Sequence, residues 1–450
     1  MEVRGKNAIV IGLGRSGVAA ATLLAARGAN VTANDSAPLE KWSEQARALA
    51  DIGVTLAPGG HHHADFANAD FVVISPGVPS FAALDAFEAI GREVIGEMEL
   101  GSRFNNAPIV LIGGTNGKST TTALTAKMFE EAGKKTFLGG NFGTPLCEVV
   151  SDQWDVLVLE ISSFQAERVP TMHARAHALL NITDDHLDRY TNFNAYAHAK
   201  GNPFVRMNEH DFAVIPKSDS IVLKQAQRGN ARVITFSATD PSADVAFDGV
   251  HLVDHISGAN YPVSTLRIAG RHNLENACAA IGLASSLGVS SEAIARALAA
   301  FEGLGHRTVR VASINGVTYY DDSKGTNVGA SVAALRGLLE PKAVLIAGGR
   351  DKLGDYAPLV DALREKGRAL VLIGEAADRI AEAAAGVLTI ERAGTMAEAV
   401  EKSSNLAQQG DAVLLSPACS SFDMFRDYKE RGDIFVQAVQ ELARRAPPCS

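Results

Sequence analysis

The sequence has few cysteines and no long apolar segment. Its four cysteines (Cys147, Cys278, Cys419 and Cys449) are scattered and include no Cys-x-x-Cys pair, which argues against a disulfide framework or a zinc site. No apolar stretch approaches the roughly 20 residues that a membrane-spanning helix needs. Residues 1–5 run directly into an apolar segment and leave no room for a signal peptide. We therefore expect a cytoplasmic protein without membrane insertion.

Blocks of basic residues are also absent. The net charge is −9, so nucleic acid is not an expected partner, whereas a small anion needs only a few local cations. With 46% hydrophobic and 21% charged residues, the chain can build ordinary hydrophobic cores. Its length of 450 residues suggests about three domains, at roughly 150 residues per domain.

Short apolar runs alternate with helical patterns in three successive blocks. The first block has apolar runs at 7–11, 30–35 and 71–75, the second block begins at 108, and a β-rich portion follows over 211–270. Such alternation predicts βαβ units and parallel sheets. The predicted fold is α/β with three domains: a Rossmann-like domain over 1–97, a central P-loop-type domain over 98–303 and a second Rossmann-like domain over 304–450.

A glycine-rich segment between a predicted strand and a predicted helix is the most informative feature of the chain. Gly114-Thr115-Asn116-Gly117-Lys118-Ser119-Thr120 follows the apolar run 108–112 and precedes the helical pattern 121–132. Such a turn directs backbone N–H groups and the positive end of a helix at one point, where a polyphosphate binds. Lys118 can follow the β- and γ-phosphates, and a hydroxyl of Ser119 or Thr120 can ligate Mg²⁺. Ile112 replaces the first glycine of the usual spacing, so the loop is a variant, and it predicts an ATP-using enzyme.

A second glycine loop lies near the amino terminus. Gly12-x-Gly14-x-x-Gly17 follows a predicted strand, and Asp35 ends the next strand. Alone, this pattern is the dinucleotide-binding fingerprint and makes a dehydrogenase the first competing hypothesis. The same loop can hold the diphosphate of any nucleotide, and no hydride-transfer site follows it. Two loops therefore favour one nucleotide as a substrate handle and ATP as the energy source. Ser75-Pro76-Gly77 either lines the same crevice or forms a turn.

Polar residues follow two predicted strands of the second block. Glu160 lies near the carboxyl end of the apolar run 155–161, where ligands bind in open α/β sheets. Mg²⁺ bound to ATP would offset the cost of burying this acid, although a solvated acid at a strand end is the alternative. His186 lies in the acidic segment 184–190, where it could ligate a second Mg²⁺ or orient a reacting carboxylate. Lys200, on the following helical segment, would alone be interpreted as a surface lysine.

Seven further segments occur in order along the chain. They are Gly-Gly-Asn-Phe-Gly at 139–143, Leu-Glu-Ile-Ser-Ser-Phe-Gln at 159–165, Asn-Ile-Thr-Asp-Asp-His-Leu-Asp-Arg-Tyr at 181–190, Gly-Arg-His-Asn-Leu-Glu-Asn at 270–276, Gly-His-Arg at 305–307, Asp-Ser-Lys-Gly-Thr-Asn at 322–327 and Leu-Ser-Pro-Ala-Cys-Ser-Ser-Phe-Asp at 415–423. Together with the loop at 114–120, they resemble the Mur ligase family of peptidoglycan synthesis over essentially the whole chain.

The resemblance implies a monomeric ligase that uses ATP and two Mg²⁺ ions to join D-glutamate to UDP-N-acetylmuramoyl-L-alanine. Residues 1–97 would bind the UDP-sugar, 98–303 would bind ATP and Mg²⁺, and 304–450 would bind the amino acid. The substrate carboxylate would attack the γ-phosphate of ATP, and the amine of D-glutamate would displace phosphate from the resulting acyl phosphate. The alternatives are a sister ligase or a folylpolyglutamate-type ligase and, from other classes, an NAD-dependent dehydrogenase or a non-catalytic nucleotide-binding regulator.

The resemblance also implies a role for each matching residue. Lys118, His186 and Lys200 would serve catalysis. The metal ligands would be Ser119, Glu160, His186 and, if it is carbamylated, Lys200. ATP would contact Gly114, Thr115, Asn116, Gly117, Lys118, Ser119, Thr120, Asn273, Asn276, Arg307, Asp322 and Lys324. The UDP-sugar would contact Gly14, Arg15, Ser16, Asp35, Ser36, Ser75 and Asn141, and D-glutamate would contact Thr326, Lys352, Ser421 and Tyr428.

Four positions depart from the family pattern. Gly113 stands where threonine usually precedes the phosphate loop, and Ala37 stands where a basic residue is common. Gly201-Asn202-Pro203 replaces an apolar helical continuation after Lys200, and Pro203 predicts that this helix ends or bends there. Val309 stands where glutamate is frequent.

Overall fold

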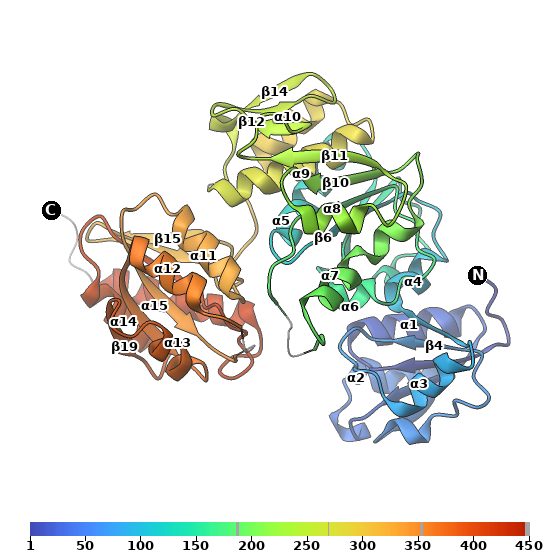
Figure 1. Cartoon of the computed structure of the whole chain (residues 1–450). Coiled ribbons are helices and arrows are strands. Elements are labelled where there is room, and N and C mark those ends of the chain that lie inside the picture. The colour runs from blue at the N-terminus through green and yellow to red at the C-terminus, as the bar shows by residue number, and fades with distance from the viewer. Residues whose placement is uncertain (186–188, 269, 352–353, 446–450) are drawn as a thin grey trace.

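The structure is a computed structural model, and it describes residues 1–185, 189–268, 270–351 and 354–445. It contains three β-sheets with helices on their faces (Figure 1). The chain completes one sheet before it enters the next, so the three regions follow the colour order of Figure 1 from blue to red. This arrangement confirms the predicted α/β fold with three domains. The sheets are separated at 97–108 and 263–308, and the domain limits near 97 and 303 stay predictions.

The amino-terminal sheet has five parallel strands in the order β3-β2-β1-β4-β5. Its central strand reads as a continuous apolar run because helices cover both faces of a parallel sheet, and Val10 and Ile11 are fully buried. The strands are β1 (Asn7–Ile11), β2 (Asn30–Asp35), β3 (Thr55–Pro58), β4 (Phe71–Ile74) and β5 (Glu93–Gly96). The helices are α1 (Arg15–Ala26), α2 (Glu44–Arg47) and α3 (Ala82–Ala89).

The middle sheet has nine strands in the order β14-β13-β12-β11-β10-β9-β6-β8-β7, with antiparallel pairing only where β13 meets β12 and β14. Its strands are β6 (Ile109–Gly113), β7 (Thr136–Gly140), β8 (Val156–Glu160), β9 (Ala176–Leu179), β10 (Phe212–Pro216), β11 (Arg232–Ser237), β12 (Val245–Phe247), β13 (His251–Asp254) and β14 (Ala259–Pro262). Its helices are α4 (Glu97–Ser102), α5 (Lys118–Glu131), α6 (Ser163–Ala166), α7 (Phe193–Gly201), α8 (Ser220–Ala226), α9 (Arg271–Ser286) and α10 (Ser291–Ala300).

The carboxy-terminal sheet has six strands in the order β15-β16-β20-β17-β18-β19, and β15 alone pairs antiparallel. Its strands are β15 (Val309–Ile314), β16 (Val317–Asp321), β17 (Ala343–Gly348), β18 (Gly367–Ile373), β19 (Thr389–Arg392) and β20 (Ala412–Leu415). Its helices are α11 (Val328–Gly337), α12 (Ala357–Lys366), α13 (Ala377–Ala383), α14 (Met396–Leu406) and α15 (Tyr428–Arg445).

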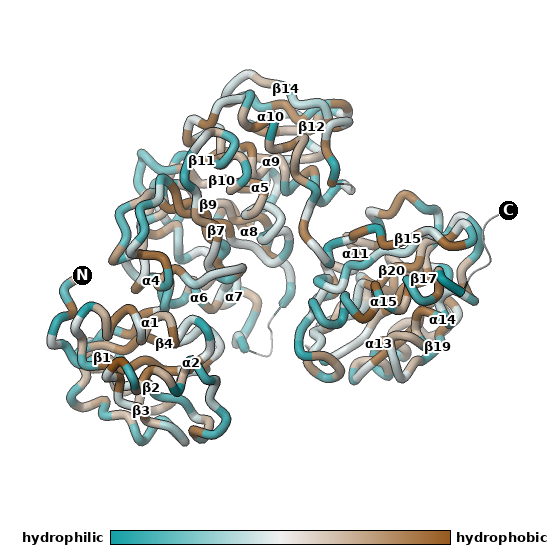
Figure 2. The backbone as a smooth tube through the Cα atoms, turned by 180° about the vertical axis from the view of Figure 1, so that it is seen from behind, coloured by the Kyte–Doolittle hydropathy of each residue, from teal (hydrophilic) through white to brown (hydrophobic). Residues whose placement is uncertain are grey.

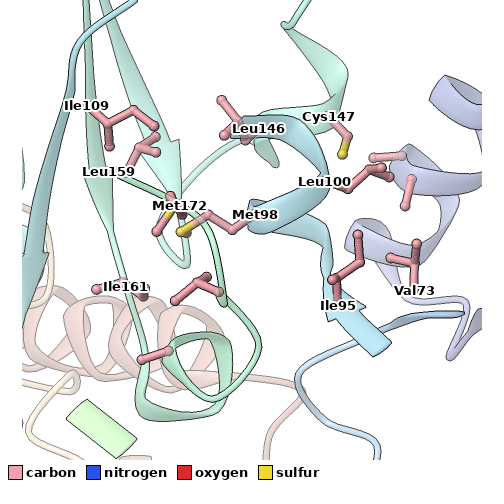
Figure 3. Packing of buried hydrophobic residues seen from close by; sticks show 14 of the residues in the cluster. Val73, Ile95, Met98, Leu100, Ile109, Leu146, Cys147, Leu159, Ile161 and Met172 are labelled. Atoms are coloured by element: carbon pink, nitrogen blue, oxygen red, sulfur yellow. The ribbon is translucent and has the colours of Figure 1, made fainter. Parts of the chain in front are cut away.

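One hydrophobic cluster crosses the junction between the amino-terminal and middle domains (Figure 3). Val73 and Ile95 come from the first sheet, Met98 and Leu100 from α4, and Leu146 from the short helix after β7. The carboxy-terminal domain instead has two clusters of its own. The first two domains therefore share a core, whereas the third packs around separate cores.

Hydrophobic residues concentrate in the strands inside the domains (Figure 2). None of the helices in the described ranges is both long enough and apolar enough to span a lipid bilayer.

The helix that carries Lys200 ends as the sequence predicts. α7 stops at Gly201, and a 3-10 helix, η5 (Asn202–Arg206), follows it with Pro203 in its first turn. Proline has no N–H group to continue the α-helical ladder, so the chain tightens and turns at this point. The change of direction brings Phe204 into the core, where it is fully buried.

Candidate functional site

A cleft of about 1110 Å³ opens between the middle and carboxy-terminal domains. Its walls come from the loop at 114–120, the carboxyl end of β8, the start of α9 and the loop between β16 and α11. These segments are distant in sequence, but the carboxyl ends of parallel strands meet at one edge of a sheet. The fold therefore gathers them around one space.

The loop at 114–120 joins β6 to α5. Gly117 has a φ of 84°, and a Cβ at this position would lie 2.2 Å from Oδ1 of Asn276 on α9, so only glycine fits. The backbone N–H groups of Thr115 and Asn116 donate to Oδ1 of Asn181 at 3.1 and 2.8 Å. The Lys118 Nζ donates to the carbonyl oxygen of Thr115 at 2.8 Å, which folds this side chain back over the loop. The cation thus lies at the positive end of α5, where an anion is stabilised.

Glu160 is a buried carboxylate at the carboxyl end of β8. Its Oε2 accepts a hydrogen bond from the Ser119 hydroxyl at 2.5 Å, and its Oε1 accepts one from Nδ2 of Asn141 at 2.7 Å. Burial raises the pKa of Glu160, but the charge of Lys118 and these two hydrogen bonds outweigh it, so the pKa lies below its usual value. The side chain is therefore an ionised acid held among donors, and it is not the solvated acid of the alternative interpretation.

The carboxy-terminal domain contributes a cation to the same cluster. Nη2 of Arg307 donates to the Ser119 hydroxyl oxygen at 2.7 Å. A second contact between the domains joins Nδ2 of Asn327 to Oδ1 of Asn116 at 3.1 Å. The loop at 114–120 of the middle domain is thus held by two hydrogen bonds from the carboxy-terminal domain.

Asp322 lies in the cleft wall next to Lys324 and is buried. It accepts hydrogen bonds from the Ser416 hydroxyl at 2.6 Å and from the Thr308 N–H at 3.1 Å. Burial raises the pKa of this carboxyl to about 7, against the opposing effects of the Ser416 hydrogen bond and the Arg307 charge. Lys324 places its Nζ 3.9 Å from the centre of the Tyr428 ring.

Lys200 is buried and borders the cleft, whereas its helical segment alone would have suggested a surface lysine. Its Nζ donates to the carbonyl oxygen of Gly114 at 2.7 Å and lies 4.7 Å from the centre of the Tyr196 ring. Burial and the nearby Lys118 lower the pKa of Lys200 well below its usual value. A buried lysine with a lowered pKa has a larger share of neutral amine, the form that reacts with carbon dioxide.

The cleft brings most of the predicted nucleotide and metal residues together. Those that line it are Thr115, Asn116, Gly117, Lys118, Ser119, Thr120, Glu160, Lys200, Asn273, Asn276, Arg307, Asp322 and Lys324. Asn141, predicted to contact the UDP-sugar, and Thr326, predicted to contact D-glutamate, line the same cleft. Gly114 lies beside the cleft and contributes its carbonyl to Lys200. His186 and Lys352, both predicted to be site residues, lie outside the described residues.

The predicted UDP-sugar residues of the first domain lie apart from this cleft. Asp35 accepts hydrogen bonds from the N–H groups of Leu13 and Ala37, both at 2.9 Å, so it braces the glycine loop from the neighbouring strand. The Ser75 hydroxyl donates to the carbonyl oxygen of Gly12 at 2.6 Å. Gly14, Arg15, Ser16 and Ser36 lie around the same strand ends, with Arg15 also bonded to Glu148 of the middle domain. Ser75 thus lies at this loop, and Ser75-Pro76-Gly77 also forms a turn, closed by a hydrogen bond from the Val78 N–H to the carbonyl oxygen of Ser75 at 3.1 Å.

The predicted D-glutamate residues are divided. Thr326 lines the cleft, Ser421 is buried, and Tyr428 begins α15 and contacts Lys324. Sequence reasoning assigned no role to Phe422, whose exposed fraction is 66% and which borders the cleft. The aromatic residue directly after Ser421, within the segment 415–423, was the available signal.

Sequence reasoning also missed the far end of the cleft. This wall contains Lys217, Ser218, Asp219, Ser220, Ile221, Phe236, Ser237, Thr239, His272 and Glu275. Most of these residues come from the ends of β10 and β11, the loops after them and the start of α8, where no glycine motif marks them and only the predicted β-rich portion 211–270 covers them. His272 and Glu275 lie instead in α9, within the segment 270–276, where sequence reasoning gave these two residues no role.

The fold and the cleft define a class, the three-domain α/β proteins in which a second domain faces a phosphate-binding loop. The sequence matches three descriptions of known families in succession: "Mur ligase MurD-like, N-terminal domain" over 6–96, "Mur ligase middle domain" over 112–284 and "Mur ligase, glutamate ligase domain" over 306–419. The chain is 44% identical over 447 residues to the UDP-N-acetylmuramoylalanine–D-glutamate ligase of Syntrophotalea carbinolica, covering 98% of this chain and 99% of that protein. It is 40% identical to the protein of the same name from Myxococcus xanthus, covering 98% and 100%. The chain belongs to the Mur ligase family.

Solved structures agree on the fold. A pseudomurein peptide ligase type C from Methanothermus fervidus aligns with a TM-score of 0.63 at 18% identity, covering 97% of this chain and 100% of that chain. A Mycobacterium tuberculosis folylpolyglutamate synthase complexed with ADP aligns with a TM-score of 0.60 at 15% identity, covering 77% and 92%.

The raised pKa of Asp322 predicts how the stability of the ligand-free protein depends on pH. The unfolded chain releases this proton near pH 3.8 and the folded protein near pH 7, so the carboxyl destabilises the fold progressively as the pH rises through that window. We expect Asp322→Asn to gain melting temperature relative to the wild type between pH 5 and pH 7, with a constant difference above that range. Differential scanning calorimetry of both proteins tests this, and parallel pH profiles would contradict it.

Proposed function

We propose that the protein is an ATP-dependent ligase that joins D-glutamate to UDP-N-acetylmuramoyl-L-alanine, forming the amide with release of ADP and phosphate. The observation that carries the proposal is the cluster of Lys118, Ser119, Glu160 and Arg307, drawn from two domains, in a chain with full-length similarity to relatives of that name. The cluster supports the use of ATP, and the similarity to relatives of that name supports the transfer of D-glutamate. The expected cytoplasmic location and monomeric state stay predictions.

ATP fits the cleft with its phosphates at the loop 114–120. Lys118 and Arg307 would then neutralise phosphate oxygens, while Asn273 and Asn276 at the start of α9 would meet the nucleoside side. Asp322 and Lys324 complete this wall from the other domain. The positive end of α5 adds to the attraction because its first N–H groups point at the same place.

Mg²⁺ fits the donor set beside these phosphates. Ser119 and Glu160 offer a hydroxyl and an ionised carboxylate in mutual contact, and such hard oxygen ligands suit a divalent cation. Carbamylation of Lys200 would add a carboxylate for a second ion, with His186 as its proposed companion. When bound, the metal would supply charge neutralisation for phosphoryl transfer.

The two remaining substrates would approach from opposite sides. The glycine loop with Gly14, Arg15 and Ser16 would hold the diphosphate of the UDP-sugar, with Asp35 and Ser36 at its base, while Ser75 and Asn141 would contact the rest of that substrate. Thr326, Lys352, Ser421 and Tyr428 would bind D-glutamate on the carboxy-terminal domain.

The proposed reaction consists of two displacements. The alanyl carboxylate attacks the γ-phosphorus of ATP, which forms an acyl phosphate and releases ADP. The amine of D-glutamate then attacks the acyl carbon, loses a proton and displaces phosphate. Such steps need positioning and neutralisation of charge, so the cluster of Lys118 and Arg307 around the loop suits them without a protein nucleophile.

The function is tested by measuring phosphate release with ATP, Mg²⁺, UDP-N-acetylmuramoyl-L-alanine and D-glutamate, with each component omitted in turn. We expect release only with the full set, and no activity with L-glutamate. Release with a different amino acid or precursor would identify a sister ligase or a folylpolyglutamate-type enzyme. Tight NAD binding without phosphate release would favour a dehydrogenase, and ATP binding without turnover would favour a regulator.

The role of Lys200 gives a second prediction. Lys200→Ala should lower turnover about a hundredfold, because the proposed carbamate ligand is lost. A high bicarbonate concentration should partly restore turnover, because the free anion can occupy the vacated space as a carboxylate, although no carbamate can form without the lysine amine. Lys127→Ala is the control, since Lys127 lies on α5 of the same domain and pairs with Glu131 at the surface. Full turnover in the Lys200 variant would exclude the carbamate.

A further inference from the structure

His177 is a fully buried histidine in β9, the strand that pairs with β6, and β6 leads into the phosphate-binding loop. The proposed reaction gives His177 no role. In the sheet register it lies opposite Leu111 of β6. Its Nδ1 is 3.2 Å from the carbonyl oxygen of Leu111, so that nitrogen carries the proton. Its Nε2 has no hydrogen-bond partner among the described residues. A buried ring nitrogen without a hydrogen-bond partner lowers the stability of the fold, so a packing role of the ring is needed to explain why histidine stands at this position.

The Cε1 edge of the imidazole occupies space that Gly113 leaves open. A Cβ at Gly113 would lie 3.1 Å from Cε1 of His177, tighter than ordinary van der Waals contact. Gly113 is the last residue of β6 and immediately precedes Gly114. It is also the position at which the family pattern has threonine. The histidine and the glycine are therefore complementary, since a larger residue at 113 would compete with the ring.

The ring of His177 also packs against the segment that carries Lys200. The ring centres of His177 and Phe204 are 4.4 Å apart at an interplanar angle of 51°. Phe204 lies in η5, the 3-10 helix that begins directly after α7 ends at Gly201. Lys200, one residue before that end, donates to the carbonyl oxygen of Gly114.

Two contacts thus join the α7–η5 segment to the start of the phosphate loop. One is the hydrogen bond from Lys200 to Gly114, and the other is the packing of Phe204 on His177 over Gly113. We propose that His177 and Gly113 form one interlocking pair that sets the position of Lys200 relative to the phosphate-binding loop, which makes His177 a positioning residue. Its consequence for turnover rests on the proposed function, whereas the coupling itself does not.

A double-mutant cycle tests the pair with Gly113→Thr, His177→Val and the double variant. Gly113→Thr alone should lower kcat about tenfold or more, because the added side chain displaces the ring and with it Phe204 and Lys200. His177→Val alone should lower kcat while leaving the KM for D-glutamate unchanged, since the amino-acid site lies on another domain. The double variant should recover kcat to within roughly threefold of the wild type, because threonine then fills the vacated space. Additive losses in the cycle would overturn the proposal.

A matched pair of milder variants separates this role from simple crowding of the core. Gly113→Ala and Gly282→Ala each add a Cβ with a contact of 3.1 Å, and in the second variant this contact is to Cγ1 of Val214 on β10. Only Gly113→Ala should weaken the binding of MgATP measured by calorimetry, whereas Gly282→Ala should leave it unchanged. Equal effects on MgATP binding would contradict the proposal.

The failure of the ligase assignment would be recognised separately. A wild-type protein without phosphate release under any substrate combination would refute the proposed function. The double-mutant cycle would then be measured by melting temperature and MgATP affinity. Non-additive changes in these two quantities would support the interlocking pair, and additive changes would overturn it.

Discussion

The arrangement of the cleft depends on the buried carboxylate of Glu160. A charge at the end of a parallel strand is expensive to bury unless hydrogen bonds and opposite charges compensate it. Ser119 and Asn141 donate to its two oxygens, and Lys118 holds its pKa low. Arg307 reaches the same Ser119 hydroxyl from the carboxy-terminal domain. This one acid therefore organises the phosphate loop, its own strand end and the approach of another domain.

The interfaces between the domains differ in chemistry in a way that suits this site. The first two domains share a hydrophobic cluster that passes through α4, which makes them a firm platform (Figure 3). The third domain reaches the loop through polar contacts such as Arg307 to Ser119 and Asn327 to Asn116. Polar contacts exchange readily with water, so they permit an amino-acid-binding domain to move towards and away from the nucleotide.

The sequence predicted the fold class and the nucleotide side of the site because both depend on local patterns. The loop at 114–120 directly follows an apolar strand and carries a glycine-lysine pattern, and Glu160 is the last residue of another apolar strand, so local sequence marks both. The edge strands β15 and β19 have largely exposed residues and lack such a run, so no local pattern marks them. The far wall of the cleft and the contact between His177 and Gly113 depend on register between distant segments, which no local pattern encodes. The burial of Lys200 became visible only when α7 was placed against Gly114.

The central claim is that this cleft activates a substrate carboxylate by transferring phosphate from ATP. The most direct measurement uses UDP-N-acetylmuramoyl-L-alanine with both carboxylate oxygens replaced by ¹⁸O, followed by mass analysis of the phosphate released with D-glutamate. Attack of the carboxylate on the γ-phosphorus predicts that one ¹⁸O atom appears in the phosphate and that the other stays in the new amide. Unlabelled phosphate would contradict the account, because it would mean that ATP is cleaved without forming an acyl phosphate.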